Sequence, residues 1–306
     1  MQETLISAGA RTANETTEEA AAENVRGIFD AIAPSYDHLN HLLSMGLDRR
    51  WWARAARSFR GVLAKPEAKV LDLCCGTGDM TAALVKLRPA GGEPVMGLDF
   101  SAEMLDRARA KFAGANVRWV EGDAMRLPFP NASFDLVTAA FGFRNLTNYA
   151  AGLAEMARVL RPGGSIGILE CNQPNGLRGV GYLWYLHSVL PRVGGWISGE
   201  RAAYAYLPAS IARFPQPPQM LAMLAEAGFV DAAWDGYLLR AAGLYRGVKR
   251  LQRWYAQGHG RHVERSAASA QRGQAVGGVV VRAGGAGDHV AEAADRRAKR
   301  VAGHAE

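Results

Sequence analysis

The sequence predicts an α/β protein with a doubly wound, mostly parallel sheet, and three observations lead to that prediction. Short apolar runs alternate with amphipathic segments over residues 68–170. A loop with two glycines follows the first apolar run, in "VLDLCCGTGD" at residues 70–79. The next two apolar runs each end in an acidic residue. Because parallel strands need crossover connections, alternation of this kind is typical of a sheet with helices on both faces.

The expected elements follow one another along the chain. Strands are expected at residues 68–74, 94–99, 116–123, 134–141 and 165–170, and helices at residues 79–87, 101–113 and 149–160. The strand segments are rich in Val, Leu and Ile, as buried parallel strands are. Ser101 is a suitable N-cap for the second helix. The third helix is followed by "RPGG" at residues 161–164, which predicts its end.

Three regions of the chain differ in composition. Residues 1–23 are polar and rich in Ala, Glu and Thr, and we expect them to be flexible. Residues 24–249 carry the regular apolar patterning and form the expected folded domain. Residues 250–306 have no aromatic residue after Tyr255 and consist largely of Ala, Gly, Arg and Val. Such a segment buries too little apolar surface to offset its ordering entropy, so we expect a disordered tail.

Charge and cysteine content narrow the classes of protein further. The net charge of +7 suits an anionic partner, but no platform of aromatic and basic residues indicates nucleic-acid binding. The three cysteines have no metal-ligand spacing, so we expect no metal site and a reducing compartment. No apolar run reaches the ~20 residues of a membrane span. These features together predict a cytoplasmic protein.

The glycine loop and the acidic strand ends predict an adenosine-like ligand. Gly76 and Gly78 let the backbone bend and approach a ligand closely, at the edge of the sheet where ligands of such folds bind. Asp99, at the end of the second strand, can accept both hydroxyls of a ribose. Asp123 and the backbone of Ala124, after the third strand, can hold the edge of an adenine.

Two ligands of this kind fit the pattern, a dinucleotide and S-adenosylmethionine. A dinucleotide site needs a third glycine where this chain has Thr81, and Asp72 and Asp79 would repel a pyrophosphate. The same two acids suit the cationic sulfonium and ammonium groups of S-adenosylmethionine, which we therefore expect. An NAD-dependent oxidoreductase and a non-catalytic cofactor-binding module stay open as alternatives.

Several blocks are specific enough to indicate a family. They are "YDHLNHLLSMGLDRRWW" (36–52), "VLDLCCGTGD" (70–79), "FGFRNLTN" (141–148), "YAYLPASIARFP" (204–215) and "LYRGVK" (244–249). In these blocks the sequence resembles the ubiquinone/menaquinone biosynthesis C-methyltransferases, in particular members that methylate demethylmenaquinone. The resemblance covers residues 24–249. It implies a seven-stranded sheet whose last strand is antiparallel, a closing hairpin within residues 236–247, and an N-terminal helical lid.

The resemblance also implies an activity and its residues. The expected reaction is C-methylation of a reduced polyprenyl quinone, from demethylmenaquinol to menaquinol, with Thr77 as a further cofactor contact. A benzoquinol of ubiquinone biosynthesis, or a small phenol or amine, is the alternative substrate. Arg144 is expected to stabilise charge developing on the ring oxygen, with Asn145 beside it and Tyr36 in the lid.

The same resemblance bears on the partners. A substrate with an isoprenoid tail needs an apolar channel, for which "YLWYLHSVLP" at residues 182–191 is the candidate. Peripheral contact with the inner face of the membrane and a homodimer are left open.

Overall fold

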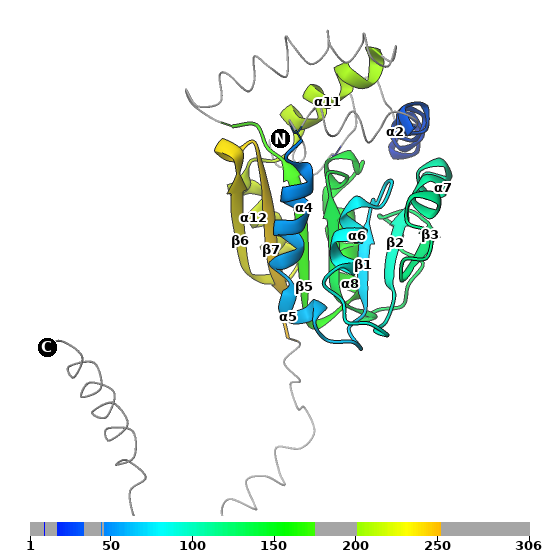
Figure 1. The fold of residues 1–306 in the computed structure, drawn as a ribbon. Helices are drawn as coiled ribbons and strands as arrows, with labels where there is room; N and C mark the ends of the chain where they lie inside the picture. The colour runs from blue at the N-terminus through cyan, green and yellow to red at the C-terminus, as the bar shows by residue number, and fades with distance from the viewer. Residues whose placement is uncertain (1–8, 10–16, 34–43, 45, 175–200, 252–306) are drawn as a thin grey trace, which may run out of the picture. The chain divides into compact units, whose positions relative to one another are not determined.

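The computed structural model describes residues 9, 17–33, 44, 46–174 and 201–251 (Figure 1). Tyr36, the segment 182–191 and residues 252–306 of the predicted tail lie outside the described residues. The helices are α2 (Glu18–Ile32), α4 (Asp48–Arg57), α5 (Arg60–Leu63), α6 (Asp79–Val85), α7 (Ala102–Lys111), α8 (Tyr149–Val159), α11 (Arg201–Arg213) and α12 (Pro217–Glu226), with short 3₁₀ helices η2 (Phe143–Asn145) and η4 (Leu238–Arg240). The strands are β1 (Val70–Leu73), β2 (Val95–Asp99), β3 (Val117–Glu121), β4 (Phe134–Ala140), β5 (Leu160–Cys171), β6 (Phe229–Tyr237) and β7 (Ala242–Lys249).

The seven strands form one sheet in the order β3-β2-β1-β4-β5-β7-β6. β1 to β5 pair in parallel, whereas β7 is antiparallel to both of its neighbours. The chain starts in the middle of the sheet, moves to one edge and then returns to build the other. The predicted doubly wound, seven-stranded architecture and the closing hairpin are therefore confirmed.

Two apolar cores lie on opposite faces of the sheet, because successive side chains of a strand point to opposite sides. α4 and α6 cover one face, where the core includes Trp52, Leu84, Val70, Leu136 and Leu169. α8 and α12 cover the other, where the core includes Leu153, Leu224, Leu71, Val137 and Ile168. Burial of both faces explains why the central strands β1 and β4 are largely apolar.

The strand register brings three loops to one edge of the sheet. Leu73 at the end of β1 pairs with Leu98 of β2 and with Ala139 of β4. The carboxyl ends of these parallel strands therefore coincide, and the loops that follow them are neighbours in space. This edge is where open α/β sheets bind their ligands.

Two elements begin earlier in the chain than predicted. β5 begins at Leu160, because the "RPGG" segment is already part of the strand, with a register shift against β4 between Phe134 and Leu136. α2 begins at Glu18, within the region expected to be flexible, because the Thr17 side chain caps it by accepting from the backbone N–H of Ala20 at 3.1 Å. Both elements therefore begin closer to the N-terminus than the sequence analysis expected.

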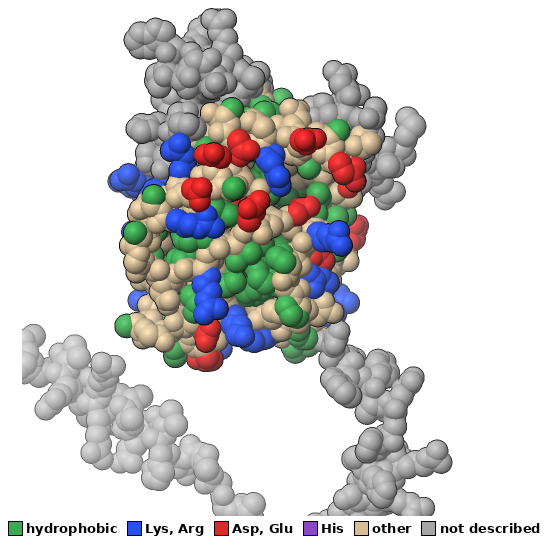
Figure 2. Space-filling model, turned by 90° about the vertical axis from the view of Figure 1, so that its right-hand side faces the viewer, with side chains coloured by type: hydrophobic (Ala, Val, Ile, Leu, Met, Phe, Trp, Pro, Cys, Tyr) green, Lys and Arg blue, Asp and Glu red, His purple; other side chains and the backbone are tan. Residues whose placement is uncertain are grey.

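The face that carries α7 and β3 shows both signs of charge (Figure 2). Acidic and basic side chains alternate around a central apolar area, so the positive charge of the chain does not gather there into a basic patch. None of the helices in the part of the chain that the structure describes is long and apolar enough to span a lipid bilayer.

Candidate functional site

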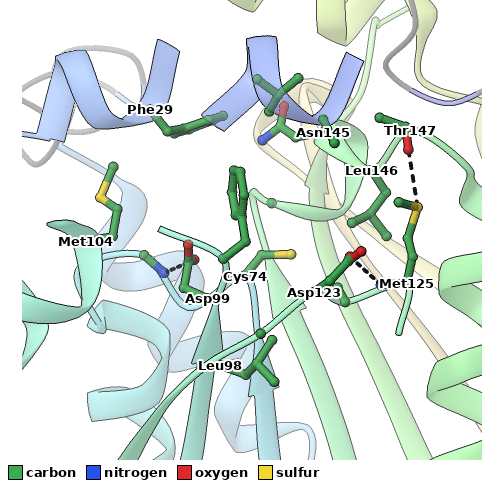
Figure 3. Close-up of a pocket in the computed structure, with 17 residues that line it drawn as sticks. Phe29, Cys74, Leu98, Asp99, Met104, Asp123, Met125, Asn145, Leu146 and Thr147 are labelled. Carbon is green, nitrogen blue, oxygen red and sulfur yellow. Dashed lines mark hydrogen bonds between the residues drawn. The ribbon is translucent and has the colours of Figure 1, made fainter. Parts of the chain in front are cut away.

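A pocket lies at the carboxyl edge of the sheet, as the register requires (Figure 3). It encloses about 670 Å³ of free space, part of it open to solvent, which falls within the ~300–1,000 Å³ of typical ligand pockets. Loops after β1, β2 and β3 form its floor, the segment after β4 forms one side and α2 forms the roof. Of the predicted residues, the lining includes Gly76, Asp99, Asp123, Ala124 and Asn145.

The glycine loop adopts a conformation that needs glycine. Gly76 and Gly78 have φ of 53° and 90°, in the left-handed region that other residues rarely adopt. A Cβ on Gly78 would lie 2.6 Å from the Trp119 side chain, so glycine is also required for space. The backbone N–H of Gly76 donates to Asp99 Oδ2 at 2.8 Å, which fixes the loop against the end of β2.

Asp99 is 5% exposed and is held by backbone donors. Its Oδ1 accepts from the backbone N–H of Ser101 at 3.0 Å, while Oδ2 accepts from Gly76. Burial raises the pKa of Asp99 to about 6, although these backbone hydrogen bonds oppose the rise. The carboxylate is thus fixed in orientation, and each oxygen keeps a lone pair for a hydroxyl donor in the pocket.

Asp123 and Ala124 lie at the floor of the same pocket. The Asp123 side chain is exposed, and its Oδ1 accepts from the backbone N–H of Met125 at 2.8 Å. This contact closes a turn directly after β3 and leaves Oδ2 for a donor on the ligand. Ala124, in contrast, is 6% exposed.

Asp72 lines a second, smaller pocket, next to the first, together with Thr77 and Asp79. The Asp72 carboxylate is fully buried and accepts from the Thr81 hydroxyl at 2.6 Å and the Thr138 hydroxyl at 2.7 Å. Burial raises its pKa to about 6, and the two hydroxyls oppose the rise. Thr81 occupies the position of the third glycine in a dinucleotide-binding motif. Its side chain has a structural role that glycine could not fill, because the Thr81 hydroxyl orients the Asp72 carboxylate.

Asp79 has a different environment from Asp72. Its carboxylate accepts from Lys111 Nζ at 2.8 Å, and the Thr77 hydroxyl lies 3.5 Å from the same oxygen. Lys111 already neutralises the charge of Asp79, so Asp72 is the stronger candidate for binding a cationic group of a ligand. Thr77 is 3% exposed, between the two acids.

Two loops at the mouth of the pockets approach each other closely. Cys74 after β1 and Phe141 after β4 have φ of 50° and 58°, unusual values for residues with a side chain. A Cβ on Gly142 would lie 2.3 Å from Cys74 Cβ, so only glycine fits there. Strained residues of this kind are concentrated at ligand sites.

The roof of the larger pocket is one face of α2, which contributes Ala22, Val25 and Phe29. Phe29 packs edge to face on Phe100 with ring centroids 6.5 Å apart. The Ser101 hydroxyl donates to Asp30 Oδ1 at 2.5 Å, which ties α2 to the beginning of α7. α2 lies in the N-terminal part of the chain where the resemblance implies a lid, and that role stays a prediction; Ala22, Val25 and Phe29 were not named in the sequence analysis.

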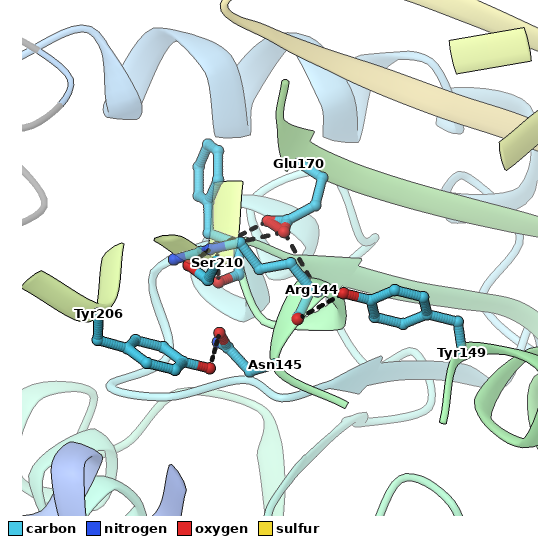
Figure 4. Close-up of polar contacts among 7 residues, drawn as sticks. Arg144, Asn145, Tyr149, Glu170, Tyr206 and Ser210 are labelled. Carbon is cyan, nitrogen blue, oxygen red and sulfur yellow. Dashed lines mark hydrogen bonds and ion pairs between the residues drawn. The ribbon is translucent and has the colours of Figure 1, made fainter. Parts of the chain in front are cut away.

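Arg144 is placed outside both pocket linings, with 7% of its surface exposed (Figure 4). Its Nη1 donates to Glu170 Oε1 at 2.8 Å and to the backbone oxygen of Phe141, and Nε lies 3.4 Å from Ser210 Oγ. Burial raises the pKa of Glu170, and the guanidinium opposes that rise. These contacts describe a buried ion pair that holds η2, and direct action of Arg144 on a substrate stays a prediction.

Glu170 and the α2 residues were missed by the sequence reasoning. Glu170 is 0% exposed at the end of β5, and its acidic side chain closes the apolar run "SIGILE". An acidic residue at the end of an apolar run is the same sequence signal that identified Asp99. Glu170, however, faces Arg144 instead of the pocket, and sequence position cannot distinguish the two orientations.

Solved structures with the same fold include several methyltransferases. A methyltransferase from Haloferax volcanii, solved with a methyltransferase activator, matches with a TM-score of 0.53 at 21% identity over 72% of this chain and 97% of that one. A methyltransferase from Thermotoga maritima described as S-adenosylmethionine-dependent matches with a TM-score of 0.50 at 18% identity, over 74% and 100%. A [4+2]-cyclase, SpnF, shares the fold with a TM-score of 0.51 at 17% identity, over 74% and 95%. The fold is thus that of the Rossmann-like class I methyltransferases, although a fold alone does not fix the reaction.

The family follows from the sequence comparisons. A family model, described as the ubiE/COQ5 methyltransferase family, matches residues 16–249. The chain belongs to this family, and it is a methyltransferase. The matched range begins just before α2 and ends with β7, so it covers α2 and the whole sheet together.

Relatives with curated names agree with that assignment. The chain is 45% identical over 230 residues to a protein of Deinococcus radiodurans named demethylmenaquinone methyltransferase, over 74% of this chain and 92% of the relative. A protein of the same name from Thermus thermophilus is 48% identical over 205 residues, 66% and 91% of the two chains. A protein of Geobacter sulfurreducens named ubiquinone/menaquinone biosynthesis C-methyltransferase is 39% identical over 75% and 90%.

Proposed function

We propose that the chain uses S-adenosylmethionine to methylate a ring carbon of a reduced polyprenyl quinone, converting demethylmenaquinol to menaquinol. The observation that carries the proposal is the 45% identity to the Deinococcus radiodurans protein over 92% of that protein's length. The family match over residues 16–249 includes both the loops that form the floor of the pocket and the helix that forms its roof.

The polar groups of the two pockets support S-adenosylmethionine as the cofactor. Asp99 and Asp123 would accept the ribose hydroxyls and the adenine amine, and Asp72 would accept the ammonium group. None of the described residues that line the two pockets is Lys or Arg. This lining favours a ligand with hydrogen-bond donors and a positive charge, and it disfavours the pyrophosphate of a dinucleotide.

The chemistry of ring methylation suggests catalytic roles for the residues that follow β4. S-adenosylmethionine supplies an electrophilic methyl group when it is bound. A ring carbon attacks such a group only when the neighbouring hydroxyl gives its proton to a base, directly or through water, so the site must stabilise the ring oxygen as it becomes negative. Transfer breaks the bond between sulfur and methyl and leaves a neutral thioether, and the methylated carbon then loses its own proton to water, which restores the aromatic ring. Asn145 lines the pocket and would donate to that oxygen, with Arg144 directly before it in η2. Tyr36 is retained as a third catalytic candidate on the resemblance.

A benzoquinol is the second candidate substrate, because the Geobacter sulfurreducens relative has both quinones in its name. Either substrate carries an isoprenoid tail, so we also propose that the protein takes it up at the surface of a membrane.

The test is a methyl-transfer assay with the full chain, S-adenosylmethionine and each reduced quinone in turn. Mass spectrometry should show one added methyl group on a ring carbon of the naphthoquinol and little product from the benzoquinol. Methylation on oxygen, or turnover of the benzoquinol alone, would contradict the proposed substrate.

A further inference from the structure

Two residues of α11 contact two adjacent residues of η2 (Figure 4). The Tyr206 hydroxyl donates to Asn145 Oδ1 at 3.0 Å, and Ser210 Oγ lies 3.4 Å from Arg144 Nε. Tyr206 and Ser210 are four residues apart, so they lie one above the other on the same face of the helix. α11 is therefore attached to η2 through polar side chains at two neighbouring points.

The hydrogen bond from Tyr206 fixes the orientation of the Asn145 side-chain amide. A side-chain amide has an acceptor oxygen and a donor nitrogen. Its terminal torsion angle χ2 is only weakly restricted, and the two orientations that exchange oxygen and nitrogen occupy nearly the same space. Because Oδ1 accepts from Tyr206, Nδ2 is directed elsewhere. Figure 3 shows the nitrogen on the side of Phe29, facing the interior of the pocket. No acceptor for Nδ2 occurs among the described residues.

We propose that Tyr206 is a positioning residue: its hydroxyl fixes the Asn145 amide so that Nδ2 donates to an acceptor oxygen of the bound ligand. This inference rests on the proposed function, in which that oxygen is the ring oxygen of the quinol. Asp99 and Asp123 accept from donors of a ligand, whereas Asn145 supplies the pocket with a donor. A carboxylate oxygen of the cofactor is the other source of the same chemistry, and separate measurements of the two ligands distinguish them.

The test is a double-mutant cycle with Tyr206→Phe and Asn145→Ala, assayed with S-adenosylmethionine and a reduced demethylmenaquinone that has a short tail. Tyr206→Phe keeps the ring and removes one hydroxyl, and we expect it to lower kcat/KM for the quinol by about 3- to 10-fold. The dissociation constant of S-adenosylmethionine, measured by calorimetry, should change by less than about twofold. In the Asn145→Ala background, Tyr206→Phe should have no further effect, because the hydroxyl then has no amide to orient.

Two further variants separate positioning from a general loosening of η2. Asn145→Asp keeps an oxygen toward Tyr206 and replaces the donor by an acceptor, so we expect it to lose at least as much as Asn145→Ala. Tyr149→Phe is the matched control, because its hydroxyl donates to the backbone oxygen of Arg144 at 2.9 Å and does not line the pocket. It should lower the melting temperature and leave kcat/KM within about twofold.

Each outcome supports or overturns the inference. Effects of Tyr206→Phe and Asn145→Ala that multiply, full activity of Asn145→Asp, or an equal loss in Tyr149→Phe would show that Tyr206 does not act through the amide. A fall in S-adenosylmethionine affinity with unchanged quinol kinetics would assign the acceptor oxygen to the cofactor, against the quinol assignment. Absence of turnover by the unmodified chain would overturn the proposed function itself, and this inference with it.

Discussion

Asp72 and Asp99 lie at the carboxyl ends of neighbouring strands, and both are buried carboxylates whose pKa is raised to about 6. A carboxyl group whose pKa in the folded protein exceeds its value in the unfolded chain, ~3.9, makes the folded state less stable as pH rises from about 4 to about 6. Above that range the free protein keeps two buried negative charges. A cationic ligand with hydroxyl donors would compensate that unfavourable charge when it binds.

Affinity for S-adenosylmethionine should therefore depend on pH. We expect it to fall as pH is lowered through about 6, because a protonated carboxyl accepts poorly and no longer attracts an ammonium group. Calorimetric titrations at about pH 7.5 and about pH 5.5 would measure the difference. Asp72→Asn removes one of the two groups and should flatten the dependence. Equal affinity at both pH values in the unmodified chain would contradict this role of the carboxylates.

Asp99 itself should contribute a defined part of cofactor affinity. Asp99→Ala removes the oxygens that would accept the ribose hydroxyls, and we expect binding to weaken by about 1.5–3 kcal/mol, the range for hydrogen bonds to charged groups. Calorimetry on the folded variant gives the value. Asp106→Ala is the matched control, since Asp106 is an exposed carboxylate paired with Arg109 on the nearby α7. An unchanged affinity in Asp99→Ala would remove this residue from the site.

Arg144 offers a test that separates stability from catalysis. Arg144→Ala leaves Glu170 as a buried unpaired carboxylate, so we expect a loss of about 3–5 kcal/mol in the free energy of unfolding. Arg144→Met combined with Glu170→Leu removes both charges and should recover most of that loss. If the guanidinium also stabilises the ring oxygen, the folded double variant still loses roughly 10²–10³ in turnover and keeps its cofactor affinity. Normal turnover in that variant would restrict Arg144 to the ion pair.

At the scale of elements, α2 forms the roof of the larger pocket. Phe29→Ala removes part of the roof and its packing on Phe100, and we expect cofactor affinity to fall by about 1–2 kcal/mol. Hydrogen exchange should show faster exchange in α2 than in β1 and β4, and slowing of α2 when S-adenosylmethionine is added. Glu19→Ala, on the exposed side of the same helix, is the control and should change neither quantity. Loss of affinity in both variants alike would indicate that the whole helix has unfolded.

The sequence predicted the parts of the site that depend on local signals. Gly76 was placed at the site because a glycine turn directly follows a strand, and Asp99 because it ends the next strand along the chain. The ion pair of Arg144 with Glu170 joins residues 26 positions apart, and the contact of Asp30 with Ser101 joins residues 71 apart. Such pairs depend on how elements pack, which no local pattern contains. Arg144 was accordingly expected to face the substrate, and its described contacts are with protein groups.

At the scale of the whole molecule, we predict that the folded domain does not need the C-terminal tail. The family match ends at residue 249 and β7 ends at Lys249, and the segment rich in Ala, Gly, Arg and Val that was expected to form a tail follows. We propose that residues 24–249, with the first turns of α2, form the methyltransferase domain. A chain that ends at Gln257 should keep its melting temperature and its turnover. Insoluble protein or reduced turnover would assign residues 258–306 a role in folding or activity.

The attachment points of α2 also determine when the site can be completed during synthesis. Of the described helices and strands, α2 leaves the ribosome first, yet Asp30 contacts Ser101, and Glu18 accepts from Asn148, a residue 130 positions later. Because the partners of an N-terminal helix must be translated before it can dock, α2 cannot belong to an early folding unit. A nascent chain that stops before β4 contains Ser101 but lacks Asn148, so α2 completes its attachment only after four of the five parallel strands have been made.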